Sequence, residues 1–214
     1  MNTLFSLLPA SLLSPKRIAL QLYASAPADY LGGDDIIQTD APEIVALAAE
    51  LRHANVDDVA YARAAYAWVR DNVAHSVDAQ DPRVTLTASE VLRERVGLCY
   101  AKSHLLTALL RAQGIPTGLC YQRLRDGNQY QLHGLIAVYL DGAWRRQDAR
   151  GNKPGVNAQF SLTQERLAWP VDYALGEVDY PNVYITAAPV IAATLRSTSD
   201  ILALCDGGLP SDLP

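Results

Sequence analysis

One cysteine stands where a thiol could act as a nucleophile, at the predicted start of a helix. Cys99 follows Gly97-Leu98 and precedes the run Tyr100–Ala112, in which every residue tolerates a helix. The free amides and the dipole of a helix N-terminus favour an anion, and therefore the thiolate form of a cysteine. We expect Gly97 to adopt a positive φ at a sharp turn into this helix. A small apolar residue buried at a helix start explains Cys99 equally well, because cysteine is among the most buried residue types.

A predicted β-hairpin brings a histidine close to an aspartate. Asp141-Gly142 is a strong two-residue turn signal between the strand-like runs Gln129–Leu140 and Ala143–Asp148. In the register that this turn sets, His133 and Asp148 emerge on one face of the sheet as diagonal neighbours, with Cβ atoms roughly 7 Å apart. A carboxylate spans that gap to an imidazole nitrogen. A shift of one residue in register would put the two side chains on opposite faces.

A thiol, a base and a carboxylate that orients the base are the three groups that nucleophilic catalysis needs. Cys99 would be the nucleophile, His133 would take and return its proton, and Asp148 would orient the imidazole. The contact between Cys99 and His133 does not follow from spacing. It requires the cysteine helix to pack on the sheet with its N-terminus near the histidine strand.

The surrounding pattern places helices before the hairpin and short segments after it. Apolar periodicity, acidic first turns and a Thr87-Ala-Ser-Glu90 capping box predict helices, and β-rich runs predict strands. The predicted helices are Glu43–His53, Asp57–Val73, a short one after Thr87, Tyr100–Ala112, Pro189–Leu195 and Asp200–Cys205; the predicted strands are Thr117–Arg125, Gln129–Leu140 and Ala143–Asp148, with Val73–Asp78 extended.

Composition limits the class of protein. The 214 residues are 50% hydrophobic and 19% charged with a net charge of −5, which suits one domain with a sizeable core. Without a basic block, nucleic acid and acidic lipid surfaces are unfavourable partners. The three cysteines are widely spaced, which argues against a disulfide-built secreted protein, and none has zinc-ligand spacing.

The N-terminal residues indicate a cytoplasmic location. Met1–Leu13 is apolar, but it lacks a preceding basic region, Pro9 interrupts it, and Lys16-Arg17 follows it instead of preceding it. This is a poor match to a signal peptide. No run in the sequence approaches the length of a membrane span.

Four further basic residues have either a structural or a catalytic interpretation. His104 is five residues after Cys99, about 140° around a helix, so a structural or surface role is favoured. His53 and His75 stand at helix ends, where a cationic imidazole suits terminal carbonyls. Lys102 is on the same helix face as Cys99, where it could hold a thiolate or be a solvated lysine.

The remaining candidates concern packing. Cys120 lies among apolar neighbours and is predicted to be core, and Cys205 to be part of a helix end. Tyr139 and Trp144 face each other across the hairpin and could wall a substrate cleft or pack in the core. Arg145-Arg146 is expected to be a solvated pair.

Several of these motifs together resemble the transglutaminase-like superfamily of cysteine enzymes. They are Gly97-Leu-Cys-Tyr-Ala, the run Leu105–Pro116, His133 with Val138–Trp144, and Asp148, within a core of about 57–151. The resemblance implies an α+β, papain-like core in which a nucleophile helix packs on an antiparallel sheet. It also implies a triad of Cys99 as nucleophile, His133 as base and Asp148 as orienting carboxylate. Gly-Leu-Ile follows the histidine where Ala-Trp-x-Glu is common, and Ala-Arg follows the aspartate, so substrate choice is less defined than the triad.

We therefore expect a single domain over residues 1–214, with an N-terminal helical segment, the core at about 57–151, and a C-terminal extension. The expected function is thiol-dependent hydrolysis of a peptide or protein amide through an acyl-enzyme on Cys99, without cofactor, metal, nucleic acid or membrane. Leu135 stands where the family commonly has tryptophan, which favours an open site and water as acceptor. The alternatives are acyl transfer from protein glutamine, as in a transglutaminase, and a non-catalytic peptide-binding domain of the same fold. No run resembles an oxygen-ligand loop for calcium.

Overall fold

The computed structural model describes residues 20–214 of the chain. The apolar run Met1–Leu13, which is predicted not to be a signal peptide, lies outside these residues. Within residues 20–214, no helix has both the length and the apolar character needed to cross a bilayer.

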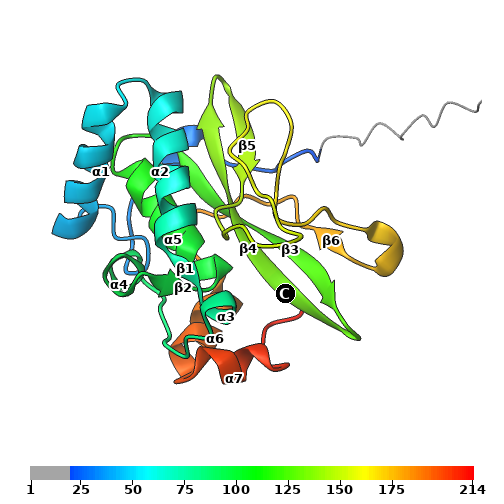
Figure 1. Cartoon of the computed structure of the whole chain (residues 1–214). Coiled ribbons are helices and arrows are strands. Elements are labelled where there is room, and N and C mark those ends of the chain that lie inside the picture. The colour runs from blue at the N-terminus through cyan, green and yellow to red at the C-terminus, as the bar shows by residue number, and fades with distance from the viewer. Residues whose placement is uncertain (1–19) are drawn as a thin grey trace, which may run out of the picture.

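The fold is α+β, with helices on one face of an antiparallel sheet (Figure 1). The helical segments are η1 (Pro27–Tyr30), α1 (Pro42–Ala54), α2 (Asp58–Asn72), α3 (Ser76–Ala79), α4 (Ala88–Glu94), α5 (Cys99–Arg111), η2 (Tyr173–Leu175), α6 (Pro189–Ser197) and α7 (Ile201–Cys205). The strands are β1 (Ala74–His75), β2 (Val96–Gly97), β3 (Thr117–Asp126), β4 (Gln129–Leu140), β5 (Ala143–Gln147) and β6 (Val178–Asp179). The main sheet has the order β5-β4-β3-β6, and β1 and β2 form a separate parallel pair.

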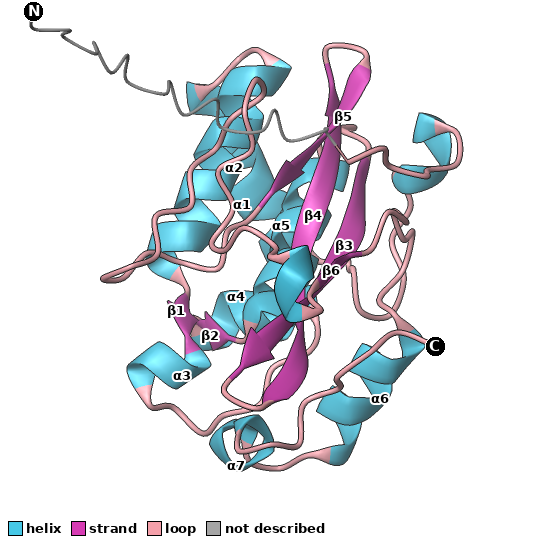
Figure 2. Ribbon diagram, turned by 90° about the vertical axis from the view of Figure 1, so that its right-hand side faces the viewer, coloured by secondary structure: helices cyan, strands magenta, loops and turns pink. Residues whose placement is uncertain are grey.

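Helix α5 is the centre of the molecule. It lies between α1, α2 and α4 on one side and strands β3 and β4 on the other, and all of its residues are buried (Figures 1 and 2). The predicted apolar stripe is one of its contact faces. The other faces are also covered because α5 is sandwiched between two layers, so its polar side chains must find partners inside the protein.

Local sequence signals define the helix starts. Asp57 caps α2 by accepting from the amide of Ala60 at 2.8 Å, and Thr87 with Glu90 forms the predicted capping box of α4. Each cap satisfies amides that have no partner inside the helix. The predicted capping box is confirmed, and Asp57 is a cap in addition to an acidic residue at the helix start.

The hairpin register is also confirmed. Strands β4 and β5 pair from Leu140↔Ala143 to Ile136↔Gln147, and the two turn residues Asp141 and Gly142 have φ values of 50° and 75°. Positive φ at both central residues matches the twist of a two-residue hairpin. Strand β3 pairs over its full length with Gln129–Val138 of β4.

Two local predictions are wrong. Gly97 is not a positive-φ residue; it lies in β2, where an added Cβ would be 2.9 Å from Thr85 Oγ1 and 3.1 Å from the Ala101 Cβ. A close approach, and not a turn, therefore requires glycine there. The segment Val73–Asp78 is extended only at β1 and then forms the single turn α3.

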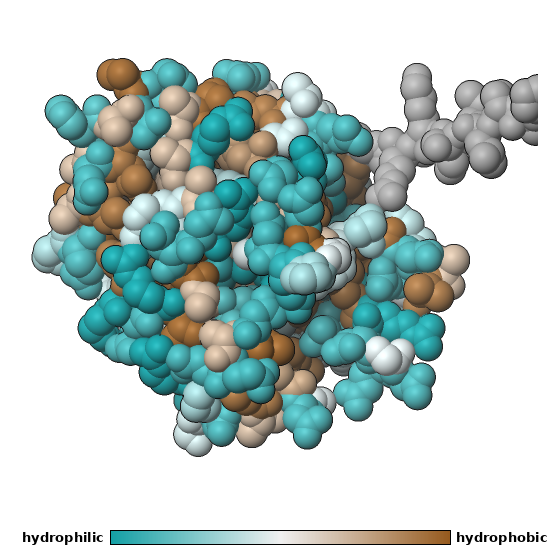
Figure 3. All heavy atoms as spheres, viewed as in Figure 1, coloured by the Kyte–Doolittle hydropathy of each residue, from teal (hydrophilic) through white to brown (hydrophobic). Residues whose placement is uncertain are grey.

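The C-terminal extension covers the lower end of the sheet in Figures 1 and 2, where α6 and α7 lie. The amide of Ala188 donates to the Tyr121 hydroxyl at 3.0 Å, and Ile191 and Leu195 enter the main core from α6. On the face drawn in Figure 3, apolar residues are scattered among polar ones.

Candidate active site

The N-terminus of α5 meets β4 at Gly134. The Gly134 amide donates to Cys99 Sγ at 3.4 Å. A Cβ at position 134 would lie 3.1 Å from the Tyr100 Cα and 3.3 Å from the Tyr100 nitrogen, so only glycine admits this approach of helix to strand. The residue after His133 therefore determines how closely the cysteine helix approaches the histidine strand.

His133 and Asp148 are hydrogen-bonded. Nε2 of His133 is 2.8 Å from Oδ2 of Asp148, which is the first residue beyond the end of β5. Two further donors hold the carboxylate: the amide of Ala168 at 2.9 Å and the amide of Arg150 at 3.0 Å. These contacts orient Asp148 fully before it meets the imidazole, so the ring in turn has one preferred orientation.

The charges of this pair stabilise each other. Burial favours a neutral His133, but the charges of Asp148 and Cys99 and hydrogen bonds with both outweigh it and raise the pKa of His133 to about 10. Burial likewise favours a neutral Asp148, but the charge and hydrogen bond of His133 outweigh it and hold the pKa of Asp148 below its usual value. The two shifts together favour a cationic His133 beside an anionic Asp148.

The structure thus brings the three predicted residues together. With Nε2 bound to Asp148, Nδ1 is the ring nitrogen left free, and the charge of Cys99 is among the causes that raise the pKa of His133. The exposed fractions are 7% for Cys99, 4% for His133 and 0% for Asp148. The site is therefore assembled and covered.

A tryptophan that sequence reasoning missed lies against the imidazole. The ring of Trp169 meets His133 edge to face, with centroids 5.1 Å apart and planes at 86°, and the Arg150 guanidinium lies 5.2 Å from the centre of the same indole. Trp169 follows Ala168, whose amide binds Asp148. The loop that carries Trp169 has no helical or strand periodicity, so the Trp-Pro dipeptide is the one signal in the sequence that could have drawn attention to it.

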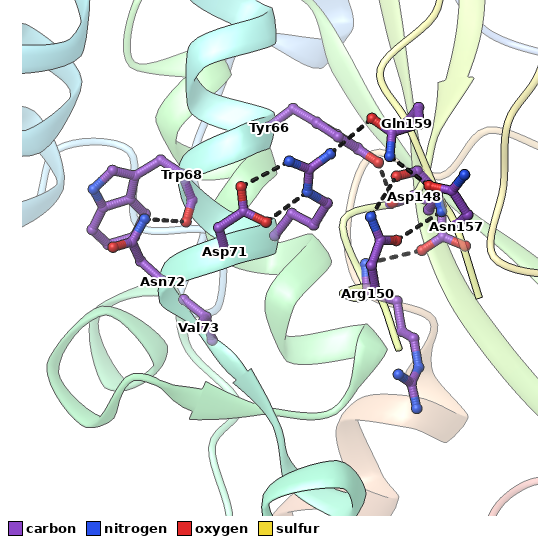
Figure 4. Close-up of polar contacts among 12 residues, drawn as sticks. Tyr66, Trp68, Asp71, Asn72, Val73, Asp148, Arg150, Asn157 and Gln159 are labelled. Carbon is purple, nitrogen blue, oxygen red and sulfur yellow. Dashed lines mark hydrogen bonds and ion pairs between the residues drawn. The ribbon is translucent and has the colours of Figure 1, made fainter. Parts of the chain in front are cut away.

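Side chains of helix α2 contact the chain just beyond the end of β5, at Asp148 (Figure 4). The Tyr66 hydroxyl donates to the main-chain oxygen of Asp148 at 2.8 Å, and Arg70 reaches Gln159 at 3.1 Å. Figure 4 shows Tyr66 extending from α2 toward Asp148 and Arg150. The carboxylate is therefore positioned from both its main chain and its side chain.

Lys102 is neither solvated nor a partner of the thiolate, so both predictions for it are wrong. Its side chain is buried, and Nζ donates to the carbonyls of Val73 at 2.5 Å and Arg70 at 3.4 Å, at the C-terminal end of α2. Burial is the main cause that lowers the pKa of Lys102 to about 7. The amine joins α5 to α2 one helical turn after Cys99.

His75 is half-buried and His104 is fully buried. Burial and then the charge of Arg150 lower the pKa of His75 to about 3, so the predicted cationic imidazole is wrong. His104 donates from Nδ1 to the Leu86 carbonyl at 2.8 Å, as a structural role requires. Arg150 itself pairs with Asp78 through both guanidinium Nη atoms.

The aromatic pair of the hairpin packs away from the triad. Trp144 contacts Tyr30 at 4.8 Å and Tyr139 at 5.4 Å between ring centroids, in a small second core. Of the expected solvated pair, Arg145 is exposed, but Arg146 is buried and forms ion pairs with Glu165 at 2.7 Å and with Asp179 at 2.5 Å.

The other two cysteines lie where packing predicted. Cys120 is fully buried on β3, Cys205 ends α7, and all three thiols are free. Over residues 20–214, no group of three or more His, Cys, Asp or Glu side chains is arranged to hold a metal ion.

Known structures resemble the chain over part of its length. A Cytophaga hutchinsonii protein provisionally described as a cysteine protease is 23% identical, with a TM-score of 0.49 over 61% of this chain and 46% of that one. The periplasmic domain of TgpA from Pseudomonas aeruginosa is 22% identical, with a TM-score of 0.44 over 59% and 48%. A TGase is 16% identical, with a TM-score of 0.43 over 71% and 44%. The chain spans about half the length of these structures.

The sequence comparison identifies the family. No curated protein matches the chain. Residues 45–149, which contain Cys99, His133 and Asp148, match the Transglutaminase-like superfamily. This chain belongs to the transglutaminase-like superfamily, with its central helix α5 packed on an antiparallel sheet.

Proposed function

We propose that the protein hydrolyses an amide or peptide bond through an acyl-enzyme on Cys99. The observation that carries this proposal is the chain of contacts at the end of β4. His133 binds Asp148 at 2.8 Å through Nε2, and the adjacent Gly134 amide binds Cys99 Sγ at 3.4 Å. A thiol, a base and an orienting carboxylate in that order form the constellation of nucleophilic acyl transfer.

The proposed reaction has two steps. The Cys99 thiolate attacks the carbonyl carbon, the C–N bond breaks, and the His133 imidazolium gives its proton to the departing amine. Water then attacks the thioester, His133 takes one of its protons, and the carboxylic acid and the thiolate are released. Asp148 stays ionised throughout, because its two amide contacts and the imidazole stabilise the carboxylate.

The amide of Cys99 is the first donor that we assign to the developing oxyanion. It lies in the first turn of α5, where a main-chain N–H has no acceptor within the helix. A fixed amide aimed at the tetrahedral oxygen contributes to catalysis without reorganisation. The aligned dipoles of α5 add to this field.

Water is the proposed acceptor in preference to an amine. Excluding water while admitting an amine calls for an apolar approach to the acyl group. Trp144 packs against Tyr30 and Tyr139 instead, and Leu135 lies in the second core. Trp169, half-buried, is the aromatic residue that contacts His133. These contacts support hydrolysis.

The proposed substrate is a peptide or protein amide, with no nucleic acid or membrane partner, and the proposed setting is the cytoplasm. The free state of Cys99, Cys120 and Cys205 supports a reducing compartment. The negative net charge supports the absence of a nucleic-acid partner from this proposal.

Mass spectrometry of reaction products tests the proposal. Reduced protein is incubated with a library of blocked peptides, some containing glutamine, together with an isotopically labelled primary amine. We expect free acids as the main products, and none from a Cys99→Ser variant. Predominant amine adducts would assign a transferase. An intact library with a folded, fully reduced protein would assign a peptide-binding role.

A further inference from the structure

Part of β4 beside the nucleophile has a main-chain edge that no strand of the main sheet covers. Strand β3 pairs with Gln129–Val138 of β4, but β5 pairs only with Ile136–Leu140. On the remaining stretch, the amides of Leu132 and Gly134 point to the edge away from β3, because residues two apart in a strand direct their main-chain groups to the same side. Gly134 meets Cys99 there, and the Leu132 amide donates to the carbonyl of Pro210 at 2.8 Å.

The occupant of this edge therefore comes from the C-terminal extension. Leu132 and Gly134 are about 7 Å apart along the strand, so the Pro210 carbonyl and Cys99 Sγ follow each other along one edge. We name residues 206–213 the strap. An extended peptide bound at the strap's place would run directly beside the thiol.

Proline suits the position opposite Leu132 for a specific reason. In a hydrogen-bonded antiparallel pair, the N–H of each residue donates to the carbonyl of the other. The Leu132 carbonyl, however, already accepts from the Tyr100 hydroxyl. Pro210 offers a carbonyl to the Leu132 amide and has no N–H that would need an acceptor in return. Any other residue there would add an N–H that needs the second lone pair of the Leu132 carbonyl or a water molecule as its acceptor.

The strap is attached along its length. Asp212 pairs with Arg123 at 2.7 Å and accepts from the Tyr180 hydroxyl, Pro210 accepts from Leu132, and Leu209 and Leu213 pack against the main core. A hollow of about 250 Å³ lies between the first part of the strap and the start of β4. It is lined by Asp126, Asn128, Gln129, Tyr130, Gln131, Cys205, Asp206, Gly207 and Leu209. The polar contacts of Asp212 and Pro210 are therefore ones that a competing segment would have to replace.

The strap also begins close to the thiol. Cys205, the residue before it, is half-buried, and its pKa is raised to about 11 by burial and then by the charge of Cys99. Cys99 itself is 7% exposed. In this arrangement little of Cys99 is open to a carbonyl carbon, so movement of a neighbouring segment would widen the access to the sulfur.

We propose that the edge of β4 at Leu132 and Gly134 is the docking strand for an extended peptide with proline opposite Leu132, and that the strap occupies it in the resting protein. This inference rests on the proposed function, since it names the substrate class of that site. The bound peptide would replace the hydrogen bond from the Leu132 amide to Pro210 and place a neighbouring carbonyl at Cys99.

Thiol labelling tests the displacement of the strap. Iodoacetamide labelling of Cys99 is followed by peptide mass spectrometry in the full chain carrying Cys205→Ser, with and without Asp212→Ala. We expect labelling about fivefold faster with Asp212→Ala, because loss of the Arg123 and Tyr180 contacts frees one end of the strap. The matched control is Asp206→Ala, which removes the same charge from the same segment without these contacts and should label like the parent. Equal rates in all three proteins would overturn the proposal.

Peptide binding tests the proline preference. Acetyl-Gly-Gly-Leu-Pro-Ser-amide and its Pro→Ala analogue are titrated into the folded Asp212→Ala protein while the amide NMR signals of Leu132 and Gly134 are followed. We expect saturable shifts of both amides and at least about fivefold weaker binding of the analogue. Absence of these shifts, or equal binding of the two peptides, contradicts the docking strand.

Neither measurement requires turnover. Faster labelling and selective binding without hydrolysis of any peptide would retain the docking strand and refute the hydrolase. Hydrolysis of a peptide, with unchanged labelling and no shift of the Leu132 amide, would retain the hydrolase and refute the docking strand.

Discussion

His133 and Asp148 are joined by a 2.8 Å hydrogen bond that forms just past the point where β4 and β5 stop pairing. If the sheet continued, the two side chains would be fixed by the ladder as diagonal neighbours. Because it ends at Gln147, the carboxylate is placed by other contacts, from Ala168 and Arg150. The pair is therefore sensitive to changes outside the sheet.

An Asp148→Asn substitution should reduce activity by a factor of about 10² to 10⁴, because the amide no longer favours the required state of the imidazole. Stability should fall by about 3 kcal/mol, since the buried amide's NH₂ faces donors that bound a carboxylate. Turnover and urea unfolding measure the two effects. Asp179→Asn is the matched control: it removes the charge opposite Arg146 at 2.5 Å and should cost stability but not turnover.

The pH dependence of stability should have a definite sign. The pKa of His133 is raised to about 10 from 6.5, so its contribution to stability is fully present below pH 6.5 and is lost as the pH rises toward 10. Urea unfolding between pH 6 and pH 10 should show this decline, and His133→Gln should reduce the slope.

An NMR titration of His133 locates the causes of this shift. Cys99→Ala should lower the midpoint, because the charge of Cys99 is one of the causes that raise the pKa. A midpoint unchanged in that variant would show that the sulfur does not interact with the ring.

Cys99 should react with iodoacetamide faster than the other two thiols near neutral pH. Burial raises the pKa of Cys120 to about 12, and burial and then Cys99 raise that of Cys205 to about 11, so neither is a thiolate. His133→Ala should slow the labelling of Cys99. Similar slow labelling of all three thiols would favour a binding domain.

Trp169 is a positioning residue whose loss should be visible without a change of fold. Trp169→Leu removes the ring edge that meets the imidazole at 5.1 Å and should lower kcat by roughly tenfold. The pH profile of Cys99 alkylation should shift in the same variant. Trp169→Phe should restore part of kcat and part of the original pH profile. Trp144→Leu, in the second core, should lower stability and leave the profile in place.

Gly134→Ala should separate the helix from the strand. The new Cβ would meet the Tyr100 backbone at 3.1 and 3.3 Å, so we expect a loss of about 1–3 kcal/mol and a lower rate of Cys99 labelling. Gly32→Ala, where a Cβ has no heavy atom within 4 Å, is the control. Equal unfolding midpoints for the two variants would contradict the close approach.

Features set by neighbouring residues could be predicted from the sequence. The Asp141-Gly142 turn determines the hairpin register, and the side chains of Asp57 and Thr87 determine helix starts within four residues. The pairing of His133 with Asp148 followed from this local geometry. The approach of Cys99 to Gly134 did not, because it depends on how α5 packs on the sheet.

Features set by distant packing could not be predicted. Trp169 reaches His133 from an irregular loop, and no periodic pattern locates such a residue. Lys102 was misjudged because lysine is ordinarily solvated, whereas burial of the whole surface of α5 leaves its amine only main-chain carbonyls as partners. Arg146 was misjudged for the same reason, since Glu165 and Asp179 come from later segments.

The spacing of the site residues along the chain has a consequence for folding order. His133 and Asp148 are 15 residues apart on one hairpin, whereas Cys99 and Gly134 are 35 apart on different elements. A hairpin closes within microseconds, while docking a helix on a sheet requires a longer loop to close. We therefore expect His133 and Asp148 to meet first and Cys99 to arrive when α5 docks, so that a chain still folding does not yet have Cys99 beside β4. Pulsed thiol labelling during refolding would follow the moment at which Cys99 acquires its reactivity.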